Sequence, residues 1–124
     1  MKVRILLAAL IIAALTPTSA LAYPVHPSRH SQAVHKAAII RTLKALHMGR
    51  ADRRAMVEIG WRESGWNPHC VTGSCLGVYQ LQTSYPRSKW ENLAWNTRKA
   101  VKYVKHRYGT PRKALAHSYR YGWY

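Results

Sequence analysis

The sequence of 124 residues has no phenylalanine, only two cysteines and only four acidic residues, against twenty lysines and arginines. With only two cysteines, the chain cannot be a disulfide-rich domain stabilised by several bridges. Internal repeats and low-complexity segments are also absent. The carboxylates are scarce enough to consider one at a time as possible acids or bases; they are Asp52, Glu58, Glu63 and Glu91.

Residues 1–22 have the pattern of a signal peptide. A short basic start precedes the apolar run from Ile5 to Leu15, which is too short to span a membrane. Ala20-Leu21-Ala22 then supplies the small residues that a signal peptidase recognises. We therefore expect cleavage after Ala22, no stable membrane anchor afterwards, and a secreted protein, either extracellular or in the cell wall. An uncleaved anchor is the alternative, and it too leaves the domain outside the cytoplasm.

Removal of 22 of the 124 residues leaves 102, which is enough for one domain. The formal net charge of +16 falls to +14, because Lys2 and Arg4 are lost. Such a surplus implies an anionic partner. For an exported protein the candidates lie at the cell surface: anionic cell-wall polymers, which we expect, phospholipid head groups, or the stem carboxylates of a glycan mesh. A nucleic-acid partner is not expected, since no nucleic-acid-binding motif is present.

The two cysteines, Cys70 and Cys75, lie close together in the sequence. In an oxidising compartment such a pair predicts a disulfide that closes a small loop, contributing about 2 kcal/mol. A metal site built from His69, Cys70 and Cys75 is the alternative, but it lacks the paired spacing of known metal ligands. We expect neither a metal nor an organic cofactor.

Apolar periodicity predicts a small, mostly helical domain over residues 31–124, after a mobile lead-in over 23–30. Ser31 is expected to cap a first helix that runs to about Met48 and stops at Gly49. Asp52 is expected to cap a second helix, with Glu63 on its last turn. An irregular segment over 69–76, an amphipathic helix over 91–108 and a short helix over 112–120 complete the domain.

Helix geometry limits which carboxylates can work together. Glu58 and Glu63 are five residues apart, so they point about 140° away from each other on a helix. Asp52 lies roughly 16 Å from Glu63 along the axis, beyond the separation of about 5 to 9.5 Å that paired carboxylates need to cleave a glycosidic bond. Only Glu91 remains, and the helix dipole explains its position. If Glu63 is catalytic, we expect it to act alone, first as acid and then as base.

Two linked motifs surround Glu63. The run Glu63-Ser64-Gly65-Trp66-Asn67-Pro68 resembles the Glu-Ser-x-x-Asn-Pro opening of the soluble lytic transglycosylase (SLT) domain family, whose fold is related to goose-type lysozyme. Gly77-Val78-Tyr79-Gln80 stands where that family has Gly-Leu-Met-Gln. The resemblance extends from about Ile40 to Tyr124, and the ending is similar to small secreted or phage-borne members from high-GC Gram-positive bacteria.

The resemblance implies a mainly α (α+β, lysozyme-like) fold with an irregular substrate loop after the catalytic helix. It implies that Glu63 is the acid/base that cleaves the MurNAc–GlcNAc β-1,4 bond of peptidoglycan glycan strands and forms 1,6-anhydro-MurNAc ends, in a monomer. Gln80 matches the motif glutamine, Thr72 a loop hydroxyl, and Tyr119 the tyrosine of a late Tyr-Asn-x-Gly motif whose asparagine is Arg120 here.

Tryptophan and tyrosine supply all the large aromatic rings of the chain. Such rings stack on sugars or fill the core. We expect Trp66 and Tyr79 in the substrate cleft and Trp61 and Trp95 in the core. His117 could line the cleft or lie on a helix surface.

Two other functions fit the same residues. One is a hydrolytic muramidase that uses Glu63 with water as the nucleophile. The other is a non-catalytic cationic cell-wall-binding protein that retains the fold only to hold glycan. Substitution of Glu63 separates catalysis from simple binding.

Overall fold

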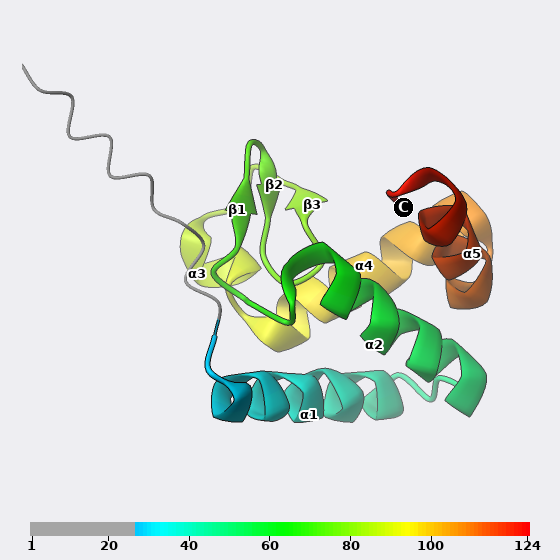
Figure 1. The fold of residues 1–124 in the computed structure, drawn as a ribbon, viewed down its shortest axis with the longest axis horizontal. Coiled ribbons are helices and arrows are strands. Elements are labelled where there is room, and N and C mark those ends of the chain that lie inside the picture. Colours follow the sequence, from blue (N-terminus) through cyan, green and yellow to red (C-terminus); the bar gives the residue numbers. More distant parts are fainter. Residues whose placement is uncertain (1–26) are drawn as a thin grey trace, which may run out of the picture.

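The structure is a computed structural model, and it describes residues 27–124. These residues form a mainly helical domain, as predicted, with one small sheet (Figure 1). The elements in chain order are α1 (Arg29–Ala45), α2 (Arg50–Ser64), β1 (Val71–Thr72), β2 (Cys75–Leu76), β3 (Leu81–Gln82), α3 (Arg87–Trp90), α4 (Leu93–Tyr108) and α5 (Pro111–Tyr121). The predicted signal peptide and residues 23–26 of the predicted lead-in lie outside the described residues.

The first two helices begin earlier than the sequence analysis predicted. Ser28, not Ser31, caps α1, because its hydroxyl oxygen accepts a hydrogen bond from the Ser31 backbone N–H at 3.1 Å. Helix α1 ends at Ala45 rather than near Met48, and Gly49 serves as the N-cap of α2. Asp52 is therefore not the cap but lies in the first turn of α2, where the helix dipole favours its negative charge.

The predicted end of α2 is confirmed. Gly65 follows the last helical residue with φ +61°, and its backbone N–H donates to the Trp61 carbonyl oxygen at 2.8 Å. Glycine adopts this left-handed conformation without a steric penalty, so it is a common helix terminator. The chain turns sharply there and leaves Glu63 on the final turn of α2.

The core lies where the four longer helices meet. Helix α2 packs against α1 and α5, and α4 packs against α1 and α5. The largest apolar side chains buried completely at this centre are Ile39, Leu43, Met56, Ile59, Val78 and Val104. Within residues 27–124, no helix is both long enough and apolar enough to span a membrane.

The sheet is antiparallel with strand order β1-β2-β3. In Figure 1 the sheet and α5 stand on opposite sides of the C-terminal end of α2.

The predicted disulfide is absent: Cys70 and Cys75 are both free and half-buried. The register of the β1–β2 hairpin explains this, because it pairs Cys75 with Thr72 and leaves Cys70 two residues farther along. Diagonal neighbours across an antiparallel pair lie about 7 to 8 Å apart, beyond the usual Cα separation of a disulfide.

Candidate active site

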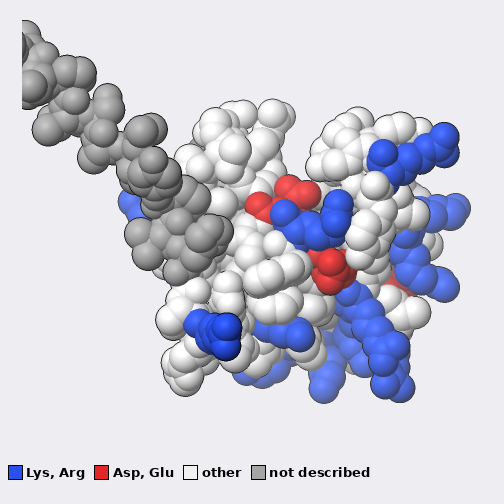
Figure 2. All heavy atoms as spheres, in the orientation of Figure 1, with Lys and Arg blue, Asp and Glu red and all other residues white. Residues whose placement is uncertain are grey.

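A groove of about 770 Å³ separates the sheet from α4 and the segment after α5. Figure 2 shows this face hollowed between two lobes, with acidic atoms (red) at the base of the hollow. The volume is in the range of ligand-binding clefts. Its lining comes from α2, the three strands, the turns beside β3, α4 and the segment after α5, and consists of Glu63, Thr72, Cys75, Gln80, Leu81, Gln82, Thr83, Tyr85, Trp95, Lys99, Tyr103, Arg107, Trp123 and Tyr124.

Glu63 is the only carboxylate that lines the groove. It is half-buried on the last turn of α2, where the negative end of the helix dipole disfavours ionisation. Burial raises its pKa above the ordinary value of 4.5, and the positive charge of Arg62 offsets part of the rise. A carboxyl group that keeps its proton to higher pH than usual is suited to donate that proton to a substrate.

The other acidic side chains have partners elsewhere. Asp52 pairs with Arg112 at 3.0 Å between α2 and α5. The Glu58 carboxylate accepts a hydrogen bond of 3.4 Å from Tyr119. Glu91 pairs with His69 and Arg87. The structure therefore agrees with the expectation that Glu63 has no second carboxylate beside it.

The loop after α2 is anchored directly behind Glu63. The Ser64 hydroxyl donates to the Val78 carbonyl oxygen at 2.8 Å and accepts from the Asn67 backbone N–H at 3.0 Å. From the other side, the Tyr79 backbone N–H donates to Asn96 Oδ1 on α4 at 3.0 Å. The two motifs found in the sequence thus contact each other through Ser64 and Val78.

Gln80 lines the groove in a left-handed conformation, with φ 49°. Its Nε2 donates to the carbonyl oxygens of Gly77 at 2.8 Å and Cys70 at 3.1 Å. Its Oε1 is buried and has no hydrogen-bond partner among the described residues. The two donor contacts therefore fix the amide in a position that keeps its oxygen buried. Thr72 also lines the groove, as predicted.

Tyr124 contributes to the groove although the sequence analysis did not select it. Its hydroxyl donates a 2.5 Å hydrogen bond to the Tyr79 carbonyl oxygen, and its ring packs edge-on against Tyr103 with centroids 5.8 Å apart. Burial raises the pKa of Tyr124 well above its usual value, and the charge of Glu63 adds to the rise. Tyr124 therefore stays protonated close to the candidate acid.

One face of α4 forms the far wall. Trp95, Lys99, Tyr103 and Arg107 line the groove at steps of four residues, which brings them onto the same side of a helix. The Lys99 ammonium lies 5.3 Å from the Tyr85 ring centroid and 5.4 Å from that of Trp95. This row brings two aromatic rings and two cations together on one wall. The sequence analysis expected Trp95 in the core, whereas the structure leaves it half-buried at the groove; the four-residue spacing was the signal that could have found the row.

Several other predicted roles are wrong. Tyr79 is fully buried, with its hydroxyl donating to the Met56 carbonyl oxygen at 3.0 Å, so only its backbone approaches the groove. Tyr119 is 60% exposed and lies against Arg62 and Glu58, outside the groove. Trp66 lines a second recess between α1 and α2, and Trp61 is 43% exposed rather than in the core. For His117, where cleft and helix surface were both open, the structure shows the helix position: it lies on α5 with Nδ1 2.9 Å from the Trp123 carbonyl oxygen and does not line the groove.

Comparison of the chain with known protein families, characterised proteins and solved structures found no match. The site therefore has to be interpreted from its own geometry. Among the described residues, no group of three histidine, cysteine, aspartate or glutamate side chains could hold a metal ion. The groove offers one half-buried carboxyl group, polar side chains, two cations and aromatic rings.

Proposed function

We propose that the protein is a lytic transglycosylase that cleaves the MurNAc–GlcNAc β-1,4 bond of peptidoglycan with Glu63 as its single acid/base. The observation that carries the proposal is that Glu63 alone among the four carboxylates lines a groove of glycan-binding size, with a raised pKa. The SLT-like motifs at Glu63 and Gln80 support the same function.

In the proposed reaction, the protonated Glu63 carboxyl group donates its proton to the glycosidic oxygen as the C1–O bond breaks. The GlcNAc side leaves with that proton as a free hydroxyl. The Glu63 carboxylate then accepts the proton of the MurNAc 6-hydroxyl, whose oxygen bonds to C1 and closes the 1,6-anhydro ring. Glu63 ends protonated, as it began. No second protein carboxylate is needed, provided that a group of the substrate stabilises the positive carbon.

The remaining groove residues fit a polar glycan strand. Trp95 and Tyr85 offer ring faces to sugars, and Thr72, Gln82 and Thr83 add polar side chains to the lining. Lys99 and Arg107 would attract the carboxylates of peptide stems on peptidoglycan. The proposal includes a lysozyme-like fold, secretion to the cell wall or medium, and action as a monomer without a cofactor.

The deciding experiment is Glu63→Gln, with Asp52→Asn as the control that removes the same charge from the same helix. We expect Glu63→Gln to lower the release of soluble muropeptides from purified peptidoglycan by at least about 100-fold. Asp52→Asn should keep activity, because Asp52 lies outside the groove in a surface pair with Arg112. Undiminished cleavage by Glu63→Gln would exclude the proposed role of Glu63.

Mass analysis of the products separates the lyase from a hydrolytic muramidase. Anhydro-muramic ends, lighter than reducing ends by one water, support the transglycosylase reaction. Reducing ends would mean that water replaces the 6-hydroxyl as nucleophile at the same Glu63. Binding to peptidoglycan without any release of fragments would favour the non-catalytic cationic protein.

A further inference from the structure

A second recess, of about 510 Å³, lies between α1 and α2 and shares no lining residue with the Glu63 groove. Five cationic side chains and one carboxylate, that of Glu58, line it. Its cations come from both helices, and they are Lys36, Lys44, Arg50, Arg53 and Arg54. Figure 2 shows lysine and arginine side chains gathered over this lower part of the molecule.

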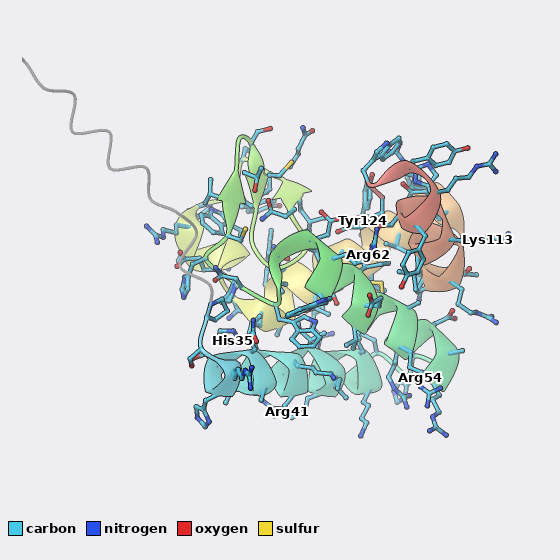
Figure 3. All side chains as sticks on the ribbon, viewed as in Figure 1. His35, Arg41, Arg54, Arg62, Lys113 and Tyr124 are labelled. Atoms are coloured by element: carbon cyan, nitrogen blue, oxygen red, sulfur yellow. The ribbon has the colours of Figure 1, made fainter. Side chains whose placement is uncertain are left out.

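None of these five cations has an acidic partner among the described residues. Arg53 donates to the Met48 carbonyl oxygen at 2.6 Å, which fixes its position without neutralising its charge. Lys36, Lys44, Arg50 and Arg54 are exposed, and Figure 3 shows Arg54 extending outward from α2. The recess therefore has an uncompensated positive rim.

The floor of the recess is apolar. Ile40 and Val57 are half-buried there, beside two tryptophans whose ring centroids are 4.7 Å apart. Trp66 is fixed by a 2.9 Å hydrogen bond from Nε1 to the Val57 carbonyl oxygen, and the Lys36 ammonium lies 4.9 Å from its ring centroid. Trp61 is left with 43% of its surface exposed.

From this combination we infer that the recess binds a phosphodiester-linked polyol chain of an anionic cell-wall polymer, at a site separate from the Glu63 groove. The phosphates pair with the arginine and lysine rim, and the carbon backbone between them lies on Trp61 and the aliphatic floor. Arginine suits this task because its planar fork matches phosphate oxygens. The inference is independent of the proposed catalysis, since it uses no groove residue.

The shape of the recess favours a single flexible chain over two other polyanions. The apolar residues form the floor while the cations project beyond them, so the flat surface of a membrane would meet the rim and leave the floor empty. A single-stranded nucleic acid stacks successive bases on a series of rings. In this recess only Trp61 has an accessible ring, because Trp66 lies under Lys36.

The test compares two double variants of the protein. The rim variant carries Lys44→Gln and Arg54→Gln, which remove two exposed charges from the recess. The control, the α4 variant, carries Arg98→Gln and Lys102→Gln, which remove one arginine and one lysine from the exposed face of α4. The probe is a short poly(glycerol phosphate) oligomer without a lipid. Binding is followed by NMR of the tryptophan indole N–H signals, and equal thermal stability of the two variants is checked first.

We expect the rim variant to lose on the order of tenfold or more in affinity, and the α4 variant less than about threefold. The oligomer should shift the Trp61 signal and leave Trp95, in the other groove, unchanged. Glu63→Gln should bind the oligomer as the wild type does, so that this test and the test of catalysis can fail separately.

Three outcomes would overturn the inference. If both double variants lost affinity for the oligomer equally, the net charge of the protein alone would explain the binding. Tighter binding of oligothymidylate than of poly(glycerol phosphate), lost in the rim variant, would assign the recess to nucleic acid. Binding to phosphatidylglycerol vesicles with no binding of the lipid-free oligomer would assign it to a membrane surface.

Discussion

The Tyr124 hydroxyl donates a hydrogen bond to the Tyr79 carbonyl oxygen, joining two residues that are 45 positions apart in the chain. Tyr79 precedes Gln80, whose free amide oxygen is buried at the groove. The contact therefore ties the segment after α5 to the loop that holds Gln80, near enough to Glu63 for its charge to raise the pKa of Tyr124.

Removal of that hydroxyl is expected to loosen the loop. Tyr124→Phe should lower the free energy of unfolding by about 1 kcal/mol, because the ring stays while one buried hydrogen bond is lost. It should also lower kcat for muropeptide release more than it raises KM. Tyr121→Phe is the matched control, since Tyr121 is 54% exposed. Identical effects of both variants would contradict a positioning role for Tyr124.

The raised pKa of Glu63 predicts an unusual alkaline limit for activity. Glu63 must be protonated to begin the reaction, so kcat/KM should fall as the pH rises through its pKa, at a pH above 4.5. The Arg62 charge lowers that pKa, so Arg62→Gln should move the limit to higher pH. The measurement is a pH profile at constant ionic strength. A limit that moves to lower pH in this variant would be inconsistent with Glu63 as the acid.

The same burial predicts that Glu63 reduces stability at neutral pH. A raised pKa in the folded state means that folding favours the protonated form. Stability from this group is complete below about pH 4.5, the ordinary pKa, and is lost as the pH rises through the folded pKa. Glu63→Gln should therefore raise Tm at pH 7 and lose this advantage near pH 4. Thermal melts at both pH values test it, and an equal gain at both would reject ionisation as the cause.

Gly77 and Gly73 form a matched pair for testing the loop. Both have positive φ, +79° and +58°, but a Cβ at Gly77 would lie 2.7 Å from the Trp90 carbonyl oxygen, whereas at Gly73 it would meet nothing within 4 Å. Gly77→Ala should cost about 2 to 4 kcal/mol, from backbone strain plus the clash. Gly73→Ala should cost only the strain, about 1 to 2 kcal/mol. Chemical denaturation measures both, and equal costs would contradict the close approach at Gly77.

Local signals in the sequence predicted most of the helical framework. Gly65 ended α2 as expected, and the amphipathic helix predicted over 91–108 is present as α4. Helix starts were less predictable, because Ser28 and Ser31 are both good caps and only the hydrogen bond between them shows which one is used. The strand register, which separates Cys70 from Cys75, depends on pairing that no spacing in the sequence specifies.

The sequence predicted the groove residues that lie close to Glu63 in the chain. It missed Tyr124, which lies far from Glu63 in the chain and reaches the groove through the fold. Glu63, Thr72 and Gln80 line one groove as expected. Tyr79 and Tyr119 were chosen for their position in motifs, but the direction of their side chains depends on packing against α2. Tyr124 enters the groove only because the chain turns back after α5, and periodicity gives no information about that turn.

Helix α2 presents Glu63 to the groove from its last turn and lines the second recess with six residues between Arg50 and Trp61. A mutational library that must preserve both surfaces would therefore have to leave these seven residues of one helix unchanged. Helix α4 carries exposed positions such as Arg98 and Lys102 that belong to neither surface. A fluorescent label or a surface tether is therefore best attached to the outer face of α4, where it leaves both surfaces of α2 accessible.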